Sequence, residues 1–136
     1  MAGGGELFQP IKQNAPSNVI LLGWVDPATV IPAADLFLST SLNEGIPYSV
    51  YESLSGGIPV VAVKSGAIGE IVQDGLNGIL TNSNPSQMSE AIRNLMKNPS
   101  VRSKMRSNAL EISNKSSEVF EMAPAHVNLY KSIHEI

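Results

Sequence analysis

The 136-residue sequence contains no cysteine, so neither disulfides nor thiolates for metal binding or nucleophilic catalysis are available. No apolar run is long enough to span a bilayer. Charged residues are sparse, at 15%, and the net charge of −3 argues against nucleic acid as a partner. An Asp-x-Asp pair, which would support metal-dependent diphosphate binding, is missing, and so is a Gly-x-x-x-x-Gly-Lys-Ser/Thr phosphate loop. What is left is an ordinary globular composition that is 43% hydrophobic.

Short apolar runs alternate with helical patterns along the first part of the chain, which predicts an α/β fold with a parallel sheet and helices on both faces. The length fits a single domain, 1–136, with an α/β part over about 1–82 and a helical part over about 83–136. We expect strands at 18–22, 36–39, 59–63 and 79–80, and helices at 6–14 (interrupted by Pro10), 26–34, 48–55, 67–72, 85–97, 100–113 and 117–134 (kinked at Pro124).

The most informative segment is 41–62, in which Glu44 and Glu52 lie eight positions apart around a predicted helix start. The first carboxylate follows a strand, and the second lies one turn into the helix. A helix N-terminus beyond a strand end offers free N–H groups to phosphate, and carboxylates accept hydrogen bonds from hydroxyl groups. Together these groups favour a ligand that carries both phosphate and hydroxyls, such as a nucleotide-sugar.

Four blocks around this pair, in order and spacing, resemble retaining glycosyltransferases of the GT-B type, especially family four. The blocks are NVILLGWV (18–25), AADLFLSTSLNEG (33–45), GGIPVVA (56–62) and GEIVQDGLNGIL (69–80), and the donor site of that family carries Glu-x7-Glu. The resemblance implies the Rossmann-like C-terminal lobe of such an enzyme, followed by a helical tail. By the same resemblance, the first strand of the lobe, its helix and the whole N-terminal lobe would precede Met1, so we expect a fragment that is truncated at its N-terminus.

The resemblance also assigns roles to the candidate residues. Glu44 would be the catalytic residue, contacting the transferred sugar near the reacting centre, and Glu52 would hold the ribose hydroxyls. The remaining donor-binding residues would be Gly45, Ile46, Tyr48 and Ser49, facing the sugar and diphosphate, and Gly23, Trp24 and Val25, at the nucleobase. Simpler interpretations stay open: a solvated loop carboxylate for Glu44, an exposed helical glutamate for Glu52, and a lid on the core for Trp24. Asn77 is interpreted as a turn residue only.

The resemblance implies binding of a sugar-nucleotide donor for metal-independent hexosyl transfer to a glycan, a lipid or another acceptor, with no cofactor and no metal. The partner would be the missing N-terminal lobe, and the location would be the cytoplasm or the inner face of a membrane. Alternatives are a nucleotide-sugar epimerase on the same lobe and a non-catalytic binding module. We expect Glu44, Glu52 and Gly23 to lie at the C-terminal edge of the sheet.

Overall fold

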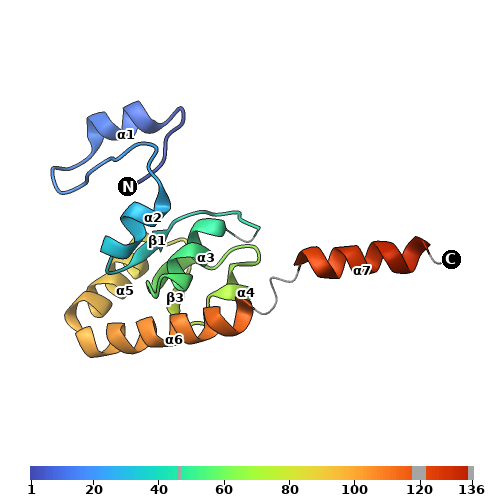
Figure 1. Ribbon diagram of the computed structural model, residues 1–136. Coiled ribbons are helices and arrows are strands. Elements are labelled where there is room, and N and C mark those ends of the chain that lie inside the picture. Colours follow the sequence, from blue (N-terminus) through green and yellow to red (C-terminus); the bar gives the residue numbers. More distant parts are fainter. Residues whose placement is uncertain (46, 118–121, 135–136) are drawn as a thin grey trace. The chain divides into compact units, whose positions relative to one another are not determined.

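The computed structural model describes residues 1–45, 47–117 and 122–134, which form two compact units, Met1–Ala34 and Asp35–Ile136. The first unit holds α1 (Phe8–Asn14), α2 (Pro27–Val30) and a short 3-10 helix, η1 (Ile31–Ala33). The second holds the sheet strands β1 (Phe37–Ser39), β2 (Val60–Val63) and β3 (Gly78–Thr81), with α3 (Tyr48–Ser55), α4 (Ile68–Ile71), α5 (Pro85–Lys97), α6 (Pro99–Ser117) and α7 (Met122–His134) (Figure 1).

The sheet of the second unit is parallel, in the order β1-β2-β3, so its three strands end at one edge. Leu38 pairs with Val61 in β2, and Val61 pairs in turn with Ile79 in β3. The central strand is buried along its whole length, as expected for a parallel strand that is covered on both faces. The predicted strands 36–39, 59–63 and 79–80 are therefore confirmed to within two residues at their ends.

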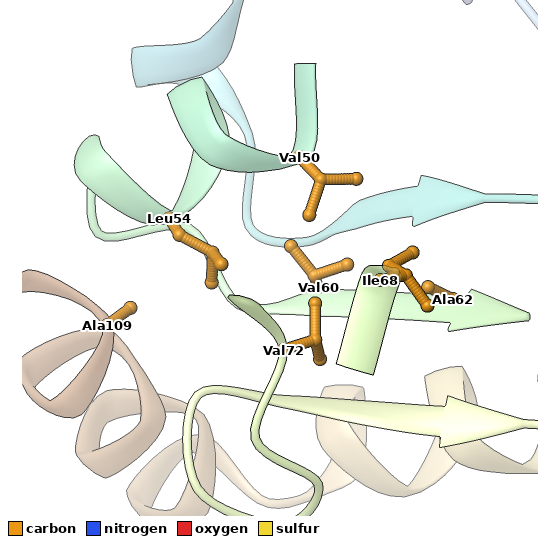
Figure 2. Close-up of a cluster of buried hydrophobic side chains, with 7 residues drawn as sticks. All are labelled: Val50, Leu54, Val60, Ala62, Ile68, Val72 and Ala109. Atoms are coloured by element: carbon orange, nitrogen blue, oxygen red, sulfur yellow. The ribbon is translucent and has the colours of Figure 1, made fainter. Parts of the chain in front are cut away.

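Alternate residues of β2 feed two separate hydrophobic clusters. Val60 and Ala62 pack with side chains from α3, α4 and α6 on one face, which Figure 2 shows converging. Val61 and Val63 pack with Met88, Ala91 and Leu95 of α5 and with Met105 of α6 on the other face. Helices thus cover both faces of the sheet, and the predicted α/β class is confirmed.

Local sequence signals set several helix boundaries as predicted. The Asp26 side chain accepts a hydrogen bond from the Ala28 N–H at 2.9 Å and caps α2, whose first residue is Pro27. Asn84 caps α5 in the same way, accepting from the N–H groups of Ser86 and Gln87. The predicted helix over 48–55 matches α3.

Two local predictions are wrong, each for a physical reason. No strand forms over 18–22. The first unit has a single parallel bridge there, between Ala2 and Gly23, and Ile20 is 70% exposed. The reason is that only residues Met1–Gly3 lie alongside this segment within the first unit. Pro10 does not interrupt α1, because it lies in the first turn, where an N–H has no acceptor within the helix. The predicted helix over 117–134, kinked at Pro124, includes residues 118–121, which lie outside the described part of the chain; the described helix α7 begins at Met122, so Pro124 lies in its first turn.

Candidate functional site

The loop after β1 carries Glu44 at the C-terminal edge of the sheet. Its side chain is half-buried, whereas the neighbouring Gly45 is exposed. The loop ends at Pro47, which is buried and adopts extended backbone angles, φ −72° and ψ 115°. Proline lacks an N–H and has a fixed φ, so it begins the helix without contributing a donor. Ile46, a predicted site residue, lies outside the described residues.

The N-terminus of α3 presents free backbone donors at this edge. The Val50 and Tyr51 N–H groups donate to the Pro47 carbonyl at 3.1 and 3.2 Å. The N–H groups of Tyr48 and Ser49 have no acceptor among the residues that the structure describes. Since the helix dipole adds positive potential at this end, the two free donors form a place where an anion would be stabilised.

Glu52 lies four residues into α3, about 6 Å along the helix axis from Tyr48 at 1.5 Å per residue. Its side chain is exposed. In the described ranges, the ion pairs are Arg102–Asp35 and Lys115–Glu111, so neither Glu44 nor Glu52 is neutralised by a basic side chain there. Both carboxylates therefore keep their lone pairs available for hydroxyl donors.

The loop after β2 supports the Glu44 loop, which sequence analysis did not predict. The Ser65 hydroxyl donates to the Ser41 carbonyl at 3.1 Å. Gly66, with φ +51°, lies so close to the Glu44 backbone that a Cβ would overlap the Glu44 carbonyl oxygen. A usable signal was present: both residues follow a parallel strand adjacent to β1, so their loop had to meet the Glu44 loop at the same edge.

The first unit contains the predicted nucleobase residues Gly23, Trp24 and Val25. Trp24 is 85% exposed, so it is not a lid on the core, and its indole lies against Gly4, where a Cβ would come within 2.5 Å of Nε1. A pocket of about 250 Å³ is lined by Gly4, Gly5, Phe8, Gln9, Gly23 and Trp24. The Gly23 carbonyl accepts from the Gly3 N–H at 2.7 Å. The unit thus offers an exposed aromatic face beside a glycine-rich backbone, which suits a planar ring.

The predicted site residues are therefore divided between the two units. Glu44, Gly45, Tyr48, Ser49 and Glu52 are brought together around the end of β1 and the start of α3. Gly23, Trp24 and Val25 belong to the other unit, so their meeting with the carboxylates at one edge stays a prediction. Among the described residues, no group of three or more His, Asp or Glu side chains could hold a metal ion. Nor does any helix in the described part have the length and apolar character to cross a membrane.

Comparison with known proteins shows the family. The family model Glycosyl transferases group 1 matches residues 1–98. An uncharacterized glycosyltransferase of Methanocaldococcus jannaschii is 31% identical over 125 residues, which cover 86% of this chain and 36% of the relative. The poly(glycerol-phosphate) alpha-glucosyltransferase of Bacillus subtilis is 35% identical over 123 residues, covering 85% of this chain and 18% of that protein. The chain thus spans about a third or less of these relatives' length.

The fold is also similar to that of solved glycosyltransferase structures. Anabaena HepE, whose structure was solved in complex with UDP-glucose, superposes with a TM-score of 0.83 at 26% identity, covering 96% of this chain and 40% of HepE. The match includes the parallel sheet with its flanking helices, and confirms the expected GT-B C-terminal lobe. Taken with the family match over 1–98, these likenesses show that the chain belongs to the group 1 glycosyl transferases.

Proposed function

We propose that this chain binds the sugar-nucleotide donor of a retaining hexosyltransferase and acts as part of a longer protein. The observation that carries the proposal is the free N-terminus of α3, whose Tyr48 and Ser49 N–H groups lie between Glu44 and Glu52 in the sequence, two carboxylates without basic partners in the described residues. A diphosphate fits the free N–H groups, and hydroxyl-bearing rings fit the carboxylates on either side.

Within this proposal each group has one task. Glu44 orients the transferred sugar by accepting from its hydroxyls, and Glu52 holds the ribose diol in the same way. The backbone at Gly45, Tyr48 and Ser49 faces the sugar and diphosphate; Ile46, which the resemblance also assigned there, lies outside the described residues. The 23–25 segment, with the exposed indole of Trp24, receives the base. The Anabaena neighbour, which was solved with UDP-glucose, supports a nucleotide-sugar as the ligand class.

The proposed reaction retains the anomeric configuration and needs no metal. The leaving diphosphate develops charge as the glycosidic bond to it breaks, and donors that are already aimed at that charge stabilise it. The α3 N-terminus supplies such donors, and the sequence contains no Asp-x-Asp pair that would hold a metal–diphosphate complex. The acceptor pocket would come from the rest of the longer protein, and the acceptor would be a glycan or a lipid. The Bacillus relative, named for glucosyl transfer to poly(glycerol-phosphate), supports a polymeric acceptor.

The location proposed for such an enzyme is the cytoplasm, or the inner face of a membrane as a peripheral protein. Membership of the group 1 glycosyl transferases favours transfer over the epimerase and binding-module alternatives. An assay that follows donor breakdown and epimer formation in parallel would separate the two enzymatic alternatives.

Calorimetric titration with UDP-glucose and UDP, and with GDP-mannose and GDP, tests the proposal. We expect Glu52→Gln to weaken binding of the sugar nucleotide and of its diphosphate equally, by about tenfold, because it loses a charge-assisted bond to the ribose. Glu44→Gln should weaken only the sugar nucleotide. The matched control is Glu90→Gln, an exposed helical glutamate in α5, which should change neither affinity. Wild-type affinities in both Glu44→Gln and Glu52→Gln would contradict the assignment of these residues to a donor site.

A further inference from the structure

The contact between Gly66 and Glu44 joins the loops that follow two adjacent strands. A Cβ on Gly66 would overlap the carbonyl oxygen of Glu44 and would also lie 2.9 Å from its carbonyl carbon. Both contacts are closer than a real Cβ atom allows. The atoms that this Cβ would meet belong to the backbone, which cannot rotate away as the end of a side chain could. The absence of a side chain at position 66 is therefore what lets the Glu44 peptide occupy its present position.

Two further features hold the same pair of loops. Gly66 has φ +51°, in the left-handed region that favours glycine, and this turns the chain from β2 toward α4. One residue earlier, the half-buried Ser65 donates its hydroxyl to the Ser41 carbonyl, three residues before Glu44. The Glu44 loop is thus supported at two points along its length by the loop after β2.

We infer that Gly66 is a positioning residue that fixes where the Glu44 carboxylate meets the sugar, with Ser65 as its auxiliary. The inference rests on the function proposed for Glu44. A side chain projects from its own peptide, so a displaced Glu44 backbone displaces the carboxylate by a similar amount. Misplacement of a reacting group by about 1 Å can cost about a hundredfold in rate, and we expect a loss in sugar recognition from the same cause. Gly66 acts through Glu44 and needs no contact with the donor.

The test compares the affinity ratio of UDP-glucose to UDP, and of GDP-mannose to GDP, across variants of the whole 136-residue chain. Gly66→Ala should lower the ratio by about tenfold or more while leaving the affinity for the nucleoside diphosphate unchanged. A purely structural defect would instead weaken both ligands together. In a Glu44→Gln background, Gly66→Ala should cause no further loss in the ratio, because two changes that act through one group are not additive.

Gly75→Ala is the matched control. Gly75 also has a positive φ, +75°, so alanine meets the same backbone penalty, but no atom lies within 4 Å of its Cβ position. It precedes β3, at the edge of the sheet opposite the Glu44 loop. The Gly75→Ala variant should show the same ratio of sugar-nucleotide to diphosphate affinity as the wild type. If Gly66→Ala does not fold, Ser65→Ala carries the test, with a smaller loss of the same ratio expected; an unchanged ratio would overturn the inference.

The outcomes separate this inference from the function on which it rests. If the wild-type chain prefers a sugar nucleotide, Glu44→Gln abolishes the preference and Gly66→Ala keeps it, only the positioning role is overturned. If Glu44→Gln leaves the ratio of sugar-nucleotide to diphosphate affinity at its wild-type value, the proposed role of Glu44 fails and the positioning role of Gly66 fails with it.

Discussion

At the scale of single residues, Asn77 shows how a turn residue can also be a core residue. It is fully buried, its Oδ1 accepts from the Gln73 N–H at 2.8 Å, and its Nδ2 donates to the Ile71 carbonyl at 3.0 Å. The side chain therefore ties the end of α4 to the start of β3. The interpretation of Asn77 as a turn residue only was wrong, because a sequence pattern does not show that the turn is folded back against the core.

Asn77→Ala should lower the free energy of unfolding by about 2–4 kcal/mol, because it removes two part-buried hydrogen bonds and leaves a cavity where the fully buried side chain was. Urea denaturation followed by circular dichroism measures the change. Asn82→Ala is the control, since that asparagine is exposed in the loop after β3 and should alter stability little. Equal stability of the two variants would show that water replaces both bonds.

The candidate site could be predicted from the sequence where local spacing is the signal. Glu44 and Glu52 were found because a helix start separates them by a fixed number of residues, and the structure places that start at Tyr48 as expected. Ser65 and Gly66 were not found, because their role comes from a contact that is distant in sequence. The exposure of Trp24 depends on tertiary surroundings in the same way, and spacing could not choose between a lid and an open face.

At the scale of elements, the predictions succeeded where a segment carries its own caps and lies next to its partner. Strands β1, β2 and β3 and helices α3 and α5 are of this kind, with turn or capping residues at their ends. The segment 18–22 has the composition of a buried strand but only Met1–Gly3 beside it, and it forms one bridge. Apolar composition predicts a strand only if other strands are available to pair with it.

Helix α6 contains an exposed ion pair whose effect depends on pH. The Lys115 ammonium, 2.7 Å from the Glu111 carboxylate, lowers the pKa of Glu111, and the carboxylate in turn raises the pKa of Lys115. A lowered acid pKa means that the stabilisation is present above the ordinary glutamate pKa and is lost as the pH falls through the lowered one. For the raised Lys115 pKa, the stabilisation is lost as the pH rises through it. The pair thus supports α6 at neutral pH.

Replacing Lys115→Gln should return the pKa of Glu111 toward its ordinary value, because both the hydrogen bond and the charge are removed. Carbon-detected NMR titration of the Glu111 side chain measures this shift directly. Lys104→Gln, an exposed substitution elsewhere in α6, should leave the Glu111 titration unchanged. An unchanged Glu111 titration in Lys115→Gln would show that the pair does not persist in solution.

At the scale of the whole molecule, α7 presents an apolar face. Val127, Leu129, Tyr130 and Ile133 are each about half exposed, between 49% and 61%, although the helical spacing places them on one side. The apolar residues Val119 and Phe120 lie outside the described residues. Exposed apolar faces of this kind promote association.

We therefore expect the purified chain to self-associate through α7. Sedimentation velocity over a range of concentrations should show reversible oligomers for the wild type. A Val127→Gln/Tyr130→Gln variant should sediment closer to the monomer, whereas Asn128→Gln, on the polar side of the same helix, should behave as the wild type does. A wild-type chain that stays monomeric at high concentration would contradict the prediction.

The transfer activity of the 136-residue chain should be limited without the rest of the longer protein that we propose. The chain corresponds to 36% of its Methanocaldococcus jannaschii relative and 40% of HepE, and its described site offers groups for a donor. Holding an acceptor in reacting position beside the donor can supply about 7–11 kcal/mol toward a transfer barrier. A chain without that pocket should bind a nucleotide weakly and show negligible transfer.

Release of UDP from UDP-glucose, with and without poly(glycerol-phosphate) as acceptor, measures the transfer that this chain achieves alone. The Glu44→Gln variant is run in parallel, because turnover that survives this change comes from a contaminant rather than from the site. Robust turnover that depends on Glu44 would refute the proposal that a second lobe completes the enzyme. Nucleotide binding without turnover is the expected result, since recognition of the donor depends on groups near α3 and at 23–25, while catalysis also requires an oriented acceptor.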